Sequence, residues 1–354
     1  MTNISKVKTL ISEHDYDAIL ITDPISRFFL TGFASSAGAL LISESNSWFF
    51  TDSRYFEAAK NELAGASVNL ADSNNPYSAQ INTVIKDLHI SNLGFEDEKM
   101  TYSAYLDWKN KLTAQLTPIK KLINDLRMIK SGDDLERIKK AHRIAEKSFL
   151  EILPQISTQI TEKQLSAELI CRFLKNGADD KAFDPIVVSG VKSSLPHGLP
   201  GDVKIGPGFL VIDFGVKLDG WCSDTTRTIS VGKPDEYMIR IYDTVLNAQK
   251  AGISTIRAGV LGRDVDAAGR SVIDEAGFGE YFGHSFGHGI GLEVHEAPSA
   301  SLMYDGIIPQ GAVITAEPGI YLPGQFGVRI EDVVYVKENG CENITAVTNE
   351  LIII

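Results

Sequence analysis

The chain has 354 residues, of which 44% are hydrophobic and 23% are charged. This composition is typical of a globular protein and excludes disordered, collagen-like and disulfide-scaffold chains, and the length predicts about two domains. The formal net charge of −12 disfavours binding to nucleic acid or to an anionic membrane, and it leaves carboxylates available for metal binding.

The first third of the chain predicts a small α/β domain. Short apolar runs at 18–21, 39–42 and 48–50 are typical of buried strands. The segments 54–63 and 102–112 have the pattern of helices. A composition change near residue 125 marks the expected boundary, which predicts domains over residues 1–125 and 126–354.

No feature of the sequence predicts export or membrane insertion. The first sixteen residues are polar and of mixed charge, unlike a signal peptide. No apolar run approaches the roughly 20 residues of a membrane span. Cys171, Cys222 and Cys341 are widely spaced and form no CxxC pair, which favours reduced thiols over a zinc site or disulfide framework. We therefore expect a cytoplasmic protein.

The second domain is predicted to begin with helices. Ser131, followed three residues later by Asp134, is typical of a helix N-cap, and apolar residues then recur at helical spacing up to residue 149. Thr161 and Gln164 match a capping box, and the helix they start is expected to stop at Gly177. Two more helices are predicted at about residues 236–257 and 264–276.

The remaining segments, 183–232 and 282–354, are rich in glycine, proline and β-branched residues, which predicts strands and turns. Residues 208–215 resemble residues 311–319, because each has a glycine turn, an apolar strand, an acid and a second glycine. This similarity suggests a duplicated half-unit.

Each of the two similar segments carries one acid and is followed by a second. Asp213 is followed by Asp224, and Glu317 is followed by Glu331, each on the next β-like run. Singly, these acids fit turn caps or ion pairs, such as Asp224 with Arg227. Together, four carboxylates would repel one another unless cations were bound, and with a histidine they suit hard or borderline divalent metals in a dinuclear site.

The seven histidines fall into two groups. Three lie in helical or polar stretches and are interpreted as surface residues: His14, His89 and His142. Four lie in glycine- and proline-rich segments and are candidates for the site: His197, His284, His288 and His295. The sequence has no HExxH motif, which excludes a zincin-type helical site.

A serine hydrolase is a competing interpretation, because Ser285 lies in a GxSxG motif at residues 283–287. A nucleophile elbow needs a strand before the serine and a helix after it. Here further glycines follow at once, and the only later histidines, His288 and His295, lie within ten residues of the serine. The sequence around the motif therefore disfavours a serine nucleophile. The sequence also has neither a Walker A loop nor a dinucleotide fingerprint.

Six segments together resemble the prolidase (Xaa-Pro dipeptidase) and aminopeptidase P family, dinuclear metallopeptidases of the pita-bread fold. The segments are LPHG at 195–198, VIDFG at 211–215, SDTTRT at 223–228, GHGIGLEVHE at 287–296, AEPGIY at 316–321 and GVRIED at 327–332. The N-terminal part resembles the creatinase-type domain of the same family. The resemblance implies an α+β fold with a small α/β creatinase-type domain followed by a pita-bread catalytic domain.

The resemblance also implies a role for individual residues. The implied metal ligands are Asp213, Asp224, His288, Glu317 and Glu331. The implied catalytic residues are His197, His284, His295, Glu317 and Arg329. Asp224 and Glu331 match the two ligands that bridge both metals, and Tyr321 matches a tyrosine near the site. Trp221 departs from the tyrosine of many relatives.

The implied function is metal-dependent hydrolysis of the bond N-terminal to proline in Xaa-Pro dipeptides, by a hydroxide that bridges two divalent cations. The cations are expected to be Mn²⁺, with Co²⁺ or Zn²⁺ as alternatives, and no organic cofactor is expected. The alternatives for the reaction are an Xaa-Pro aminopeptidase acting on longer peptides and a creatinase-like hydrolase. The expected partners are proline-containing di- or short peptides and a second copy of the chain in a homodimer, with no nucleic-acid or membrane partner.

Overall fold

The computed structural model describes residues 3–354, and the chain divides into two compact units, Met1–Arg127 and Met128–Ile354. We propose these two units as the two domains of the protein. Within the described residues, no helix combines the length and the apolar character needed to cross a membrane.

The first unit is built on a six-stranded mixed sheet with the order β4-β3-β2-β1-β5-β6. Strand β1 pairs antiparallel with β2 and parallel with β5. All four residues of β1 are buried, as expected of a strand covered on both faces. The strands are β1 (Ala18–Ile21), β2 (Ala39–Ser43), β3 (Ser47–Thr51), β4 (Ser67–Leu70), β5 (Asn92–Phe95) and β6 (Gln115–Pro118).

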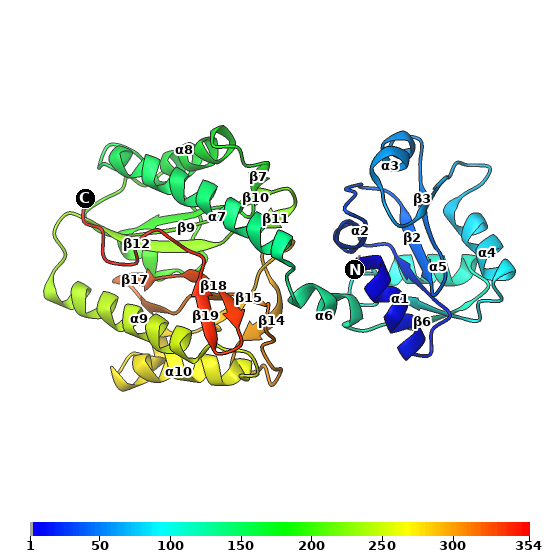
Figure 1. The fold of residues 1–354 in the computed structure, drawn as a ribbon. Coiled ribbons are helices and arrows are strands. Elements are labelled where there is room, and N and C mark those ends of the chain that lie inside the picture. The colour runs from blue at the N-terminus through cyan, green and yellow to red at the C-terminus, as the bar shows by residue number, and fades with distance from the viewer. Residues whose placement is uncertain (1–2) are drawn as a thin grey trace. The chain divides into compact units, whose positions relative to one another are not determined.

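Helices flank this sheet (Figure 1). Ile81 and Ile85 of α4 belong to the same apolar cluster as Leu20 and Leu41 of the sheet. The helices are α1 (Asn3–Glu13), α2 (Pro24–Thr31), α3 (Phe56–Glu62), α4 (Tyr77–Asp87), α5 (Tyr102–Lys111) and α6 (Leu122–Met128), the last of which extends to the unit boundary.

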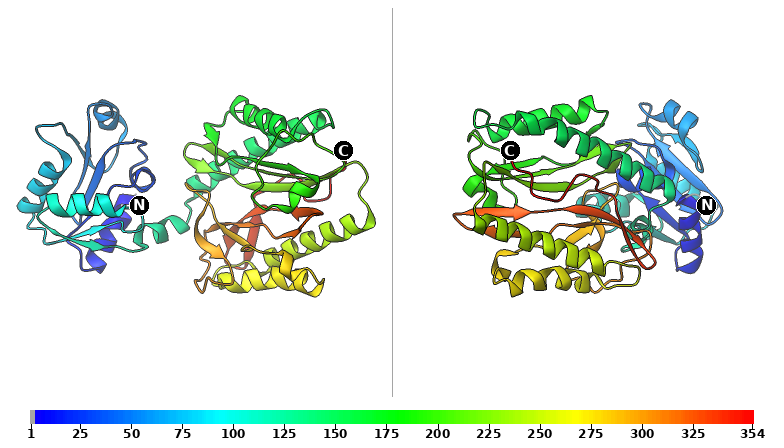
Figure 2. Two further views of the ribbon diagram at one scale, coloured as in Figure 1. Left: turned by 180° about the vertical axis from the view of Figure 1, so that it is seen from behind. Right: turned by 60° about the vertical axis from the view of Figure 1, so that its left-hand side comes forward.

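The second unit places its strands between two pairs of helices. Helices α7 and α8 cover one side of the strands, and α9 and α10 cover the opposite side (Figures 1 and 2). The four helices are α7 (Gly132–Ile152), α8 (Glu162–Lys175), α9 (Glu236–Thr255) and α10 (Gly262–Glu275). Short 3₁₀ turns are η1 (Leu153–Gln155), η2 (Gly190–Ser194) and η3 (Gly279–Tyr281). This mixture of helices and strands is the predicted α+β class.

The strands of this unit form several small sheets, of which two bring the candidate metal ligands together. One has the order β12-β9-β8 and the other has the order β14-β13-β15-β18-β19. The strands are β7 (Asp180–Lys181), β8 (Ile186–Ser189), β9 (Gly208–Phe214), β10 (Val216–Leu218), β11 (Trp221–Cys222), β12 (Thr225–Val231), β13 (Gly287–Gly289), β14 (Glu296–Ala300), β15 (Val313–Ala316), β16 (Gly319–Leu322), β17 (Phe326–Arg329), β18 (Asp332–Lys337) and β19 (Gly340–Asn343).

Local sequence signals set the starts of the helices on one side. The Ser131 side chain accepts a hydrogen bond from the Asp134 backbone, and the Asp134 carboxylate accepts one from the Ser131 backbone. Thr161 and Gln164 make the same reciprocal pair before α8. Each pair satisfies two backbone donors that a helix start leaves open, so both predicted caps are confirmed.

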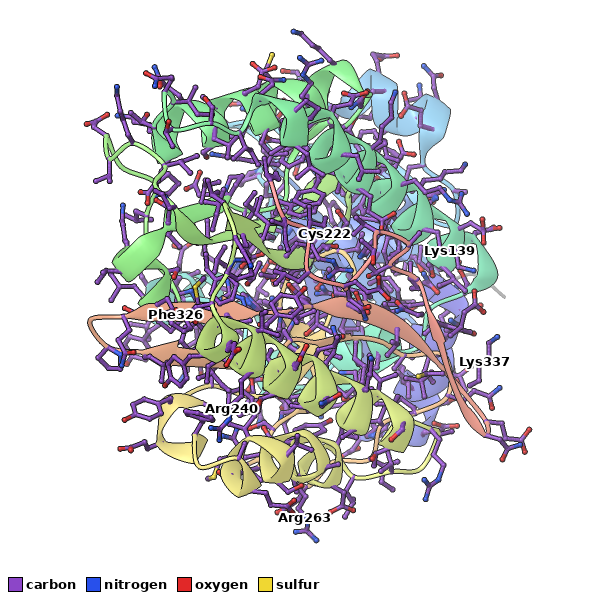
Figure 3. All side chains as sticks on the ribbon, turned by 90° about the vertical axis from the view of Figure 1, so that its left-hand side faces the viewer. Lys139, Cys222, Arg240, Arg263, Phe326 and Lys337 are labelled. Carbon is purple, nitrogen blue, oxygen red and sulfur yellow. The ribbon has the colours of Figure 1, made fainter. Side chains whose placement is uncertain are left out.

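The packed core lies between the strands and the helices. Phe149 of α7 stacks on Phe214 of β9 with ring centroids 5.0 Å apart. Figure 3 shows Lys139 and Lys337 on the same side of the unit. Both lysines pair with Glu342, at 2.9 and 2.7 Å, and their hydrogen bonds lower the pKa of that carboxyl to about 2.

Candidate metal centre

The first pair of acids lies on neighbouring antiparallel strands. Asp213 belongs to β9, opposite Thr226 of β12. Asp224 precedes β12 by one residue, next to the register pair of Phe214 and Thr225. The apolar strand β9 is buried almost throughout, so it carries the Asp213 carboxylate into the interior of the unit.

The second pair repeats this arrangement on the other sheet. Glu317 directly follows β15, and Glu331 directly precedes β18, with Ala316 and Asp332 opposite each other between them. Thr226 joins the two sheets, because its hydroxyl donates to Glu331 Oε2 at 2.8 Å and its carbonyl accepts from the Glu331 backbone at 3.1 Å. The two similar sequence segments and the acids that follow them therefore bring four carboxylates to one place.

His288 completes the cluster from β13. Its Nε2 lies 3.2 Å from Glu317 Oε1 and 3.7 Å from Asp224 Oδ2. One atom each of Asp224, His288 and Glu331 lie within 4.8 Å of one another. The flanking glycines are needed for close approach, because a Cβ at Gly287 would lie 2.0 Å from the Thr315 carbonyl oxygen.

All nine residues predicted for the site line one cavity of about 410 Å³. They are His197, Asp213, Asp224, His284, His288, His295, Glu317, Arg329 and Glu331. The sequence interpretation did not single out the apolar wall, which includes Phe183, Ile186, Leu199 and Val294. Isolated apolar residues carry no motif, so no sequence signal separates them from ordinary core residues.

The cluster suits divalent cations. Burial raises the pKa of Asp224 and of Glu331 well above the usual range, and neighbouring carboxylates raise both further. Asp213 Oδ1 and Glu331 Oε1 are buried without a hydrogen-bond partner. Bound cations would offset the repulsion and occupy these oxygens. Oxygen ligands with one imidazole and no thiolate fit a hard or borderline divalent ion.

His288 and Glu317 form a coupled pair. Burial alone would raise the pKa of Glu317 and lower that of His288. Burial is the largest single effect on each group, but their hydrogen bond and the surrounding charges together outweigh it, so the pKa of Glu317 falls to about 2 and the pKa of His288 rises. Glu317 is therefore held as a carboxylate, the state in which it can bind a cation or accept a proton.

Arg329 connects the acids to the rest of the cavity. Its side chain is 4% exposed and donates to Asp213 Oδ2 at 2.6 Å. It also donates to the Tyr321 hydroxyl at 2.8 Å and to the Pro196 carbonyl at 3.1 Å. The guanidinium keeps its charge, because the charges and bonds of Tyr321 and Asp213 outweigh burial and raise its pKa.

The remaining histidines lie around the acids. His284 Nε2 lies 2.9 Å from the Tyr321 hydroxyl, and burial lowers the pKa of His284. The ring of His295 lies 4.3 Å from that of His288, and burial together with His288 lowers the pKa of His295. Both are therefore favoured in the neutral form, which has one donor and one acceptor nitrogen.

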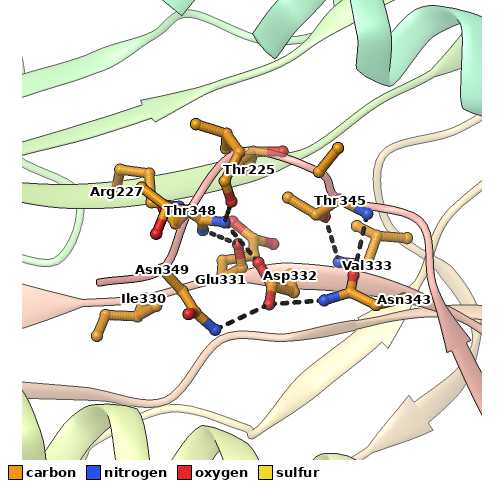
Figure 4. A network of polar contacts seen from close by, with 12 residues as sticks. Thr225, Arg227, Ile330, Glu331, Asp332, Val333, Asn343, Thr345, Thr348 and Asn349 are labelled. Atoms are coloured by element: carbon orange, nitrogen blue, oxygen red, sulfur yellow. Dashed lines mark hydrogen bonds and ion pairs between the residues drawn. The ribbon is translucent and has the colours of Figure 1, made fainter. Parts of the chain in front are cut away.

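Behind Glu331 lies a buried polar network, drawn in Figure 4. Arg227 pairs with Asp332 at 2.6 Å and donates to the Glu331 carbonyl at 2.5 Å. Asn343 and Asn349 donate to the other Asp332 oxygen at 3.0 and 3.5 Å. The interpretation of Asp224 as the ion-pair partner of Arg227 is therefore wrong. Arg227 instead binds Asp332 and the backbone carbonyl of Glu331.

His142 is not a surface residue, which corrects the sequence interpretation. It is 0% exposed on α7, where its Nδ1 contacts the Ile138 carbonyl at 3.0 Å. Its Nε2 accepts from the Asp224 backbone at 3.5 Å, and burial lowers its pKa. Helical periodicity alone could have identified it, since it follows the buried Ala141 and lies four residues after the buried Ile138.

Ser285 lies in the cavity wall, but the element that follows it is strand β13 and not a helix. The nucleophile elbow needs the opposite arrangement, a strand before the serine and a helix after it. The structural context therefore disfavours the serine-hydrolase interpretation.

Family comparisons extend over most of the chain. The model of metallopeptidase family M24 matches residues 136–338, and the model of the creatinase/prolidase N-terminal domain matches residues 3–129. The chain is 35% identical over 352 residues to the Xaa-Pro dipeptidase of Pyrococcus furiosus, with 99% of each chain covered.

Two solved structures have the same fold along their whole length. The Xaa-Pro dipeptidase from Bacillus anthracis has a TM-score of 0.96 and 41% identity, with 99% of each chain covered. The X-Pro aminopeptidase from Thermotoga maritima MSB8 has a TM-score of 0.92 and 38% identity, with 100% of each chain covered.

Proposed function

This chain belongs to metallopeptidase family M24, and from that premise we propose that it hydrolyses the bond between Xaa and proline in Xaa-Pro dipeptides. The observation that carries the proposal is the cavity in which Asp213, Asp224, His288, Glu317 and Glu331 converge. The arginine and histidines beside these ligands supply hydrogen-bond donors where a small peptide would lie. The Xaa-Pro dipeptidases similar to this chain support the choice of substrate.

We propose that the five ligands hold two divalent cations. When bound, the cations would acidify the attacking water and polarise the scissile carbonyl. Mn²⁺ is the proposed ion because four of the five ligands are carboxylates, with Co²⁺ or Zn²⁺ as alternatives.

The side chains then have separate tasks. Glu317 takes a proton from the attacking water as the new C–O bond forms, and it delivers that proton to the prolyl nitrogen as the C–N bond breaks. The prolyl nitrogen has no N–H of its own, so its departure depends on this delivery. His197, His284 and His295 are proposed to donate hydrogen bonds to the peptide oxygens.

Arg329 is proposed to hold neighbouring groups of the site in position rather than to take part in the reaction itself. Its bond to Asp213 fixes one ligand, and its bonds to Tyr321 and Pro196 fix the cavity wall. Phe183, Ile186 and Val294 give the apolar surface that a pyrrolidine ring would contact. We also propose a cytoplasmic homodimer: the wide spacing of the three cysteines, with no CxxC pair, favours a reducing compartment, and the resemblance to the family favours the dimer.

The decisive experiment compares Xaa-Pro, Xaa-Pro-Yaa, Xaa-Pro-amide and Xaa-Ala at matched Mn²⁺. A dipeptidase should prefer Xaa-Pro over its amide by about tenfold in kcat/KM, roughly 1.4 kcal/mol, because the amide lacks the free carboxylate. Equal cleavage of Xaa-Ala would contradict proline specificity. Full activity after EDTA dialysis, with less than one metal per chain, would contradict the metal mechanism.

An Xaa-Pro aminopeptidase is the second candidate, favoured by the similarity to the Thermotoga maritima structure. Faster cleavage of Xaa-Pro-Yaa and Xaa-Pro-amide than of Xaa-Pro would select it. Hydrolysis of creatine with no cleavage of any of these peptides would instead select a creatinase-like reaction.

A further inference from the structure

Glu162 makes a set of contacts that the reaction itself does not require. It lies in the first turn of α8, and its side chain is 0% exposed. An acid at this helix position is ordinarily a solvated charge that interacts favourably with the helix dipole. A buried carboxylate is instead costly unless its oxygens are fully paired.

The Glu162 carboxylate is fully paired, by a segment distant in the sequence. Oε1 accepts from the Ser189 backbone at 2.8 Å and from its hydroxyl at 3.1 Å. Oε2 accepts from Lys192 Nζ at 2.7 Å and from the Gly201 backbone at 3.0 Å. One carboxylate therefore holds both ends of the segment 190–201, which leaves β8 after Ser189 and returns to α8 at Gly201.

The backbone of α8 strengthens the returning end. The Glu162 N–H donates to the Val203 carbonyl, and the Lys163 N–H donates to the Gly201 carbonyl, both at 3.0 Å. These donors are among those that a helix start leaves unpaired. The carboxylate adds two bonds to Ser189 at the other end of the segment.

The segment held in this way carries His197 into the cavity. Leu195 and Leu199 on either side are 54% and 72% exposed, so packing at the tip is sparse. The Pro196 carbonyl accepts from Arg329 at 3.1 Å, which ties the tip to the site. The Gly327 backbone also donates to Ser193 Oγ at 2.8 Å. Fixing both ends of the segment adds to these contacts by reducing the number of conformations that the exposed tip can adopt.

We propose that Glu162 is a positioning residue for His197, acting through the segment 190–201. The inference rests on the proposed function, because it assigns His197 a task in that reaction. Asp266 of α10 offers a parallel: it is fully buried, accepts from the Phe286 backbone at 2.9 Å, and pairs with Arg270, which donates to the His284 carbonyl at 2.7 Å.

Hydrogen exchange followed by mass spectrometry tests, without substrate, whether the bonds of Glu162 anchor the segment 190–201. Glu162→Gln keeps the size of the side chain but turns one oxygen into an NH₂ donor facing other donors. In the Mn²⁺-loaded protein, this variant should exchange residues 190–201 at least tenfold faster. The control is Glu168→Gln, which removes an acid of the same helix that pairs with Arg172 instead and should leave the segment protected.

Kinetics on Xaa-Pro test the positioning. Glu162→Gln should lower kcat/KM by about tenfold or more while the metal content stays at that of the wild type. Introduced into a His197→Ala background, the same change should cost less than twofold, because a residue that acts through His197 has no effect once His197 is gone.

The outcomes separate the anchor from the function. Unchanged exchange in Glu162→Gln overturns the anchor, and equal losses with and without His197 overturn the positioning role. If the wild type cleaves no Xaa-Pro peptide, the proposed function fails, while the exchange result still decides the anchor. If Glu162→Gln does not fold, Lys192→Met removes one of the four bonds, and faster exchange confined to 190–201 is again expected.

Discussion

Arg329 shows how a single residue unites several parts of the site. One guanidinium contacts a ligand carboxylate, a tyrosine hydroxyl and a backbone carbonyl, and its Nε also donates to the Thr226 hydroxyl at 3.1 Å. Thr226 in turn donates to Glu331. The planar fork of arginine can reach these acceptors at once, whereas the lysine ammonium is a point charge.

Arg329→Lys should therefore lower kcat/KM on Xaa-Pro by about 100-fold, roughly 2.7 kcal/mol. The charge is kept, but the simultaneous bonds to Asp213, Tyr321 and Pro196 are lost. Steady-state kinetics with metal analysis measure the effect. Arg240→Lys on the exposed side of α9 is the control and should be neutral, and a loss of less than twofold at position 329 would contradict the orienting role.

At the scale of elements, the packing of α9 against α10 depends on one aromatic ring. Phe286 is 0% exposed and lies against Gly252 of α9 and Gly269 of α10. A Cβ at Gly269 would lie 2.4 Å from the Phe286 ring, and one at Gly252 would lie 2.1 Å from it. Because Phe286 precedes β13, the ring also sets the position of the strand that carries His288.

Gly269→Ala should destabilise the second unit by about 1–3 kcal/mol, because the added methyl overpacks this contact. Calorimetry of the metal-loaded protein should show its transition lowered by several degrees. Gly132→Ala is the matched control: Gly132 begins α7 with nothing within 4 Å of its added Cβ, so alanine should be neutral or slightly stabilising. Equal unfolding temperatures for the wild type and Gly269→Ala would show that the ring can move aside.

For the whole molecule, the division into two units predicts separate responses to ligands and pH. Every predicted ligand lies in the unit Met128–Ile354. Cations that bind only the folded form stabilise it by mass action, by about 2.7 kcal/mol at 100 times the Kd.

Removal of metal with EDTA should therefore lower the unfolding temperature of the second unit and leave that of Met1–Arg127 unchanged. Differential scanning calorimetry resolves the two transitions. The variant Asp224→Asn lacks one proposed ligand, so its second transition should begin lower and respond weakly to EDTA. Equal shifts of both transitions, or none, would argue against a metal centre confined to the second unit.

The first unit has its own pH dependence, set by Glu96. This side chain is 5% exposed, and burial raises its pKa from 4.5 to about 7. The folded unit binds the proton more tightly than the unfolded chain does. The stabilisation is therefore fully present below about pH 4.5 and is lost as the pH rises through about 7, by up to about 3 kcal/mol.

Urea unfolding at pH 5 and pH 8 measures this loss. The variant Trp221→Phe confines tryptophan fluorescence to Trp48 and Trp108 of the first unit. In that background, Glu96→Gln should flatten the pH dependence. The control is the exposed residue Glu98. Glu98→Gln should keep the pH dependence of the unfolding free energy. If the unfolding free energy of Glu96→Gln changes with pH as much as that of the background protein, another group is responsible for the pH dependence.

Local sequence signals determined a large part of this fold. The caps at Ser131 and Thr161, the buried strand at 18–21 and the α+β class depend on neighbours within a few residues, and all are confirmed. Motif order also indicated the family, which the matches to M24 and to the creatinase/prolidase N-terminal domain confirm. Spacing and composition suffice for such features because they are properties of short stretches of chain.

Only the tertiary structure decided which distant groups meet. Arg227 pairs with Asp332, 105 residues away, rather than with nearby Asp224. His142 is buried beside the Asp224 backbone, and Glu162 contacts Gly201, 39 residues along the chain. A charge or an imidazole has the same local pattern on a surface as in a core, and its partner is chosen by how helices and sheets pack. The candidate ligands and Arg329 could therefore be named from the sequence, whereas the contacts of Arg227, His142 and Glu162 could not.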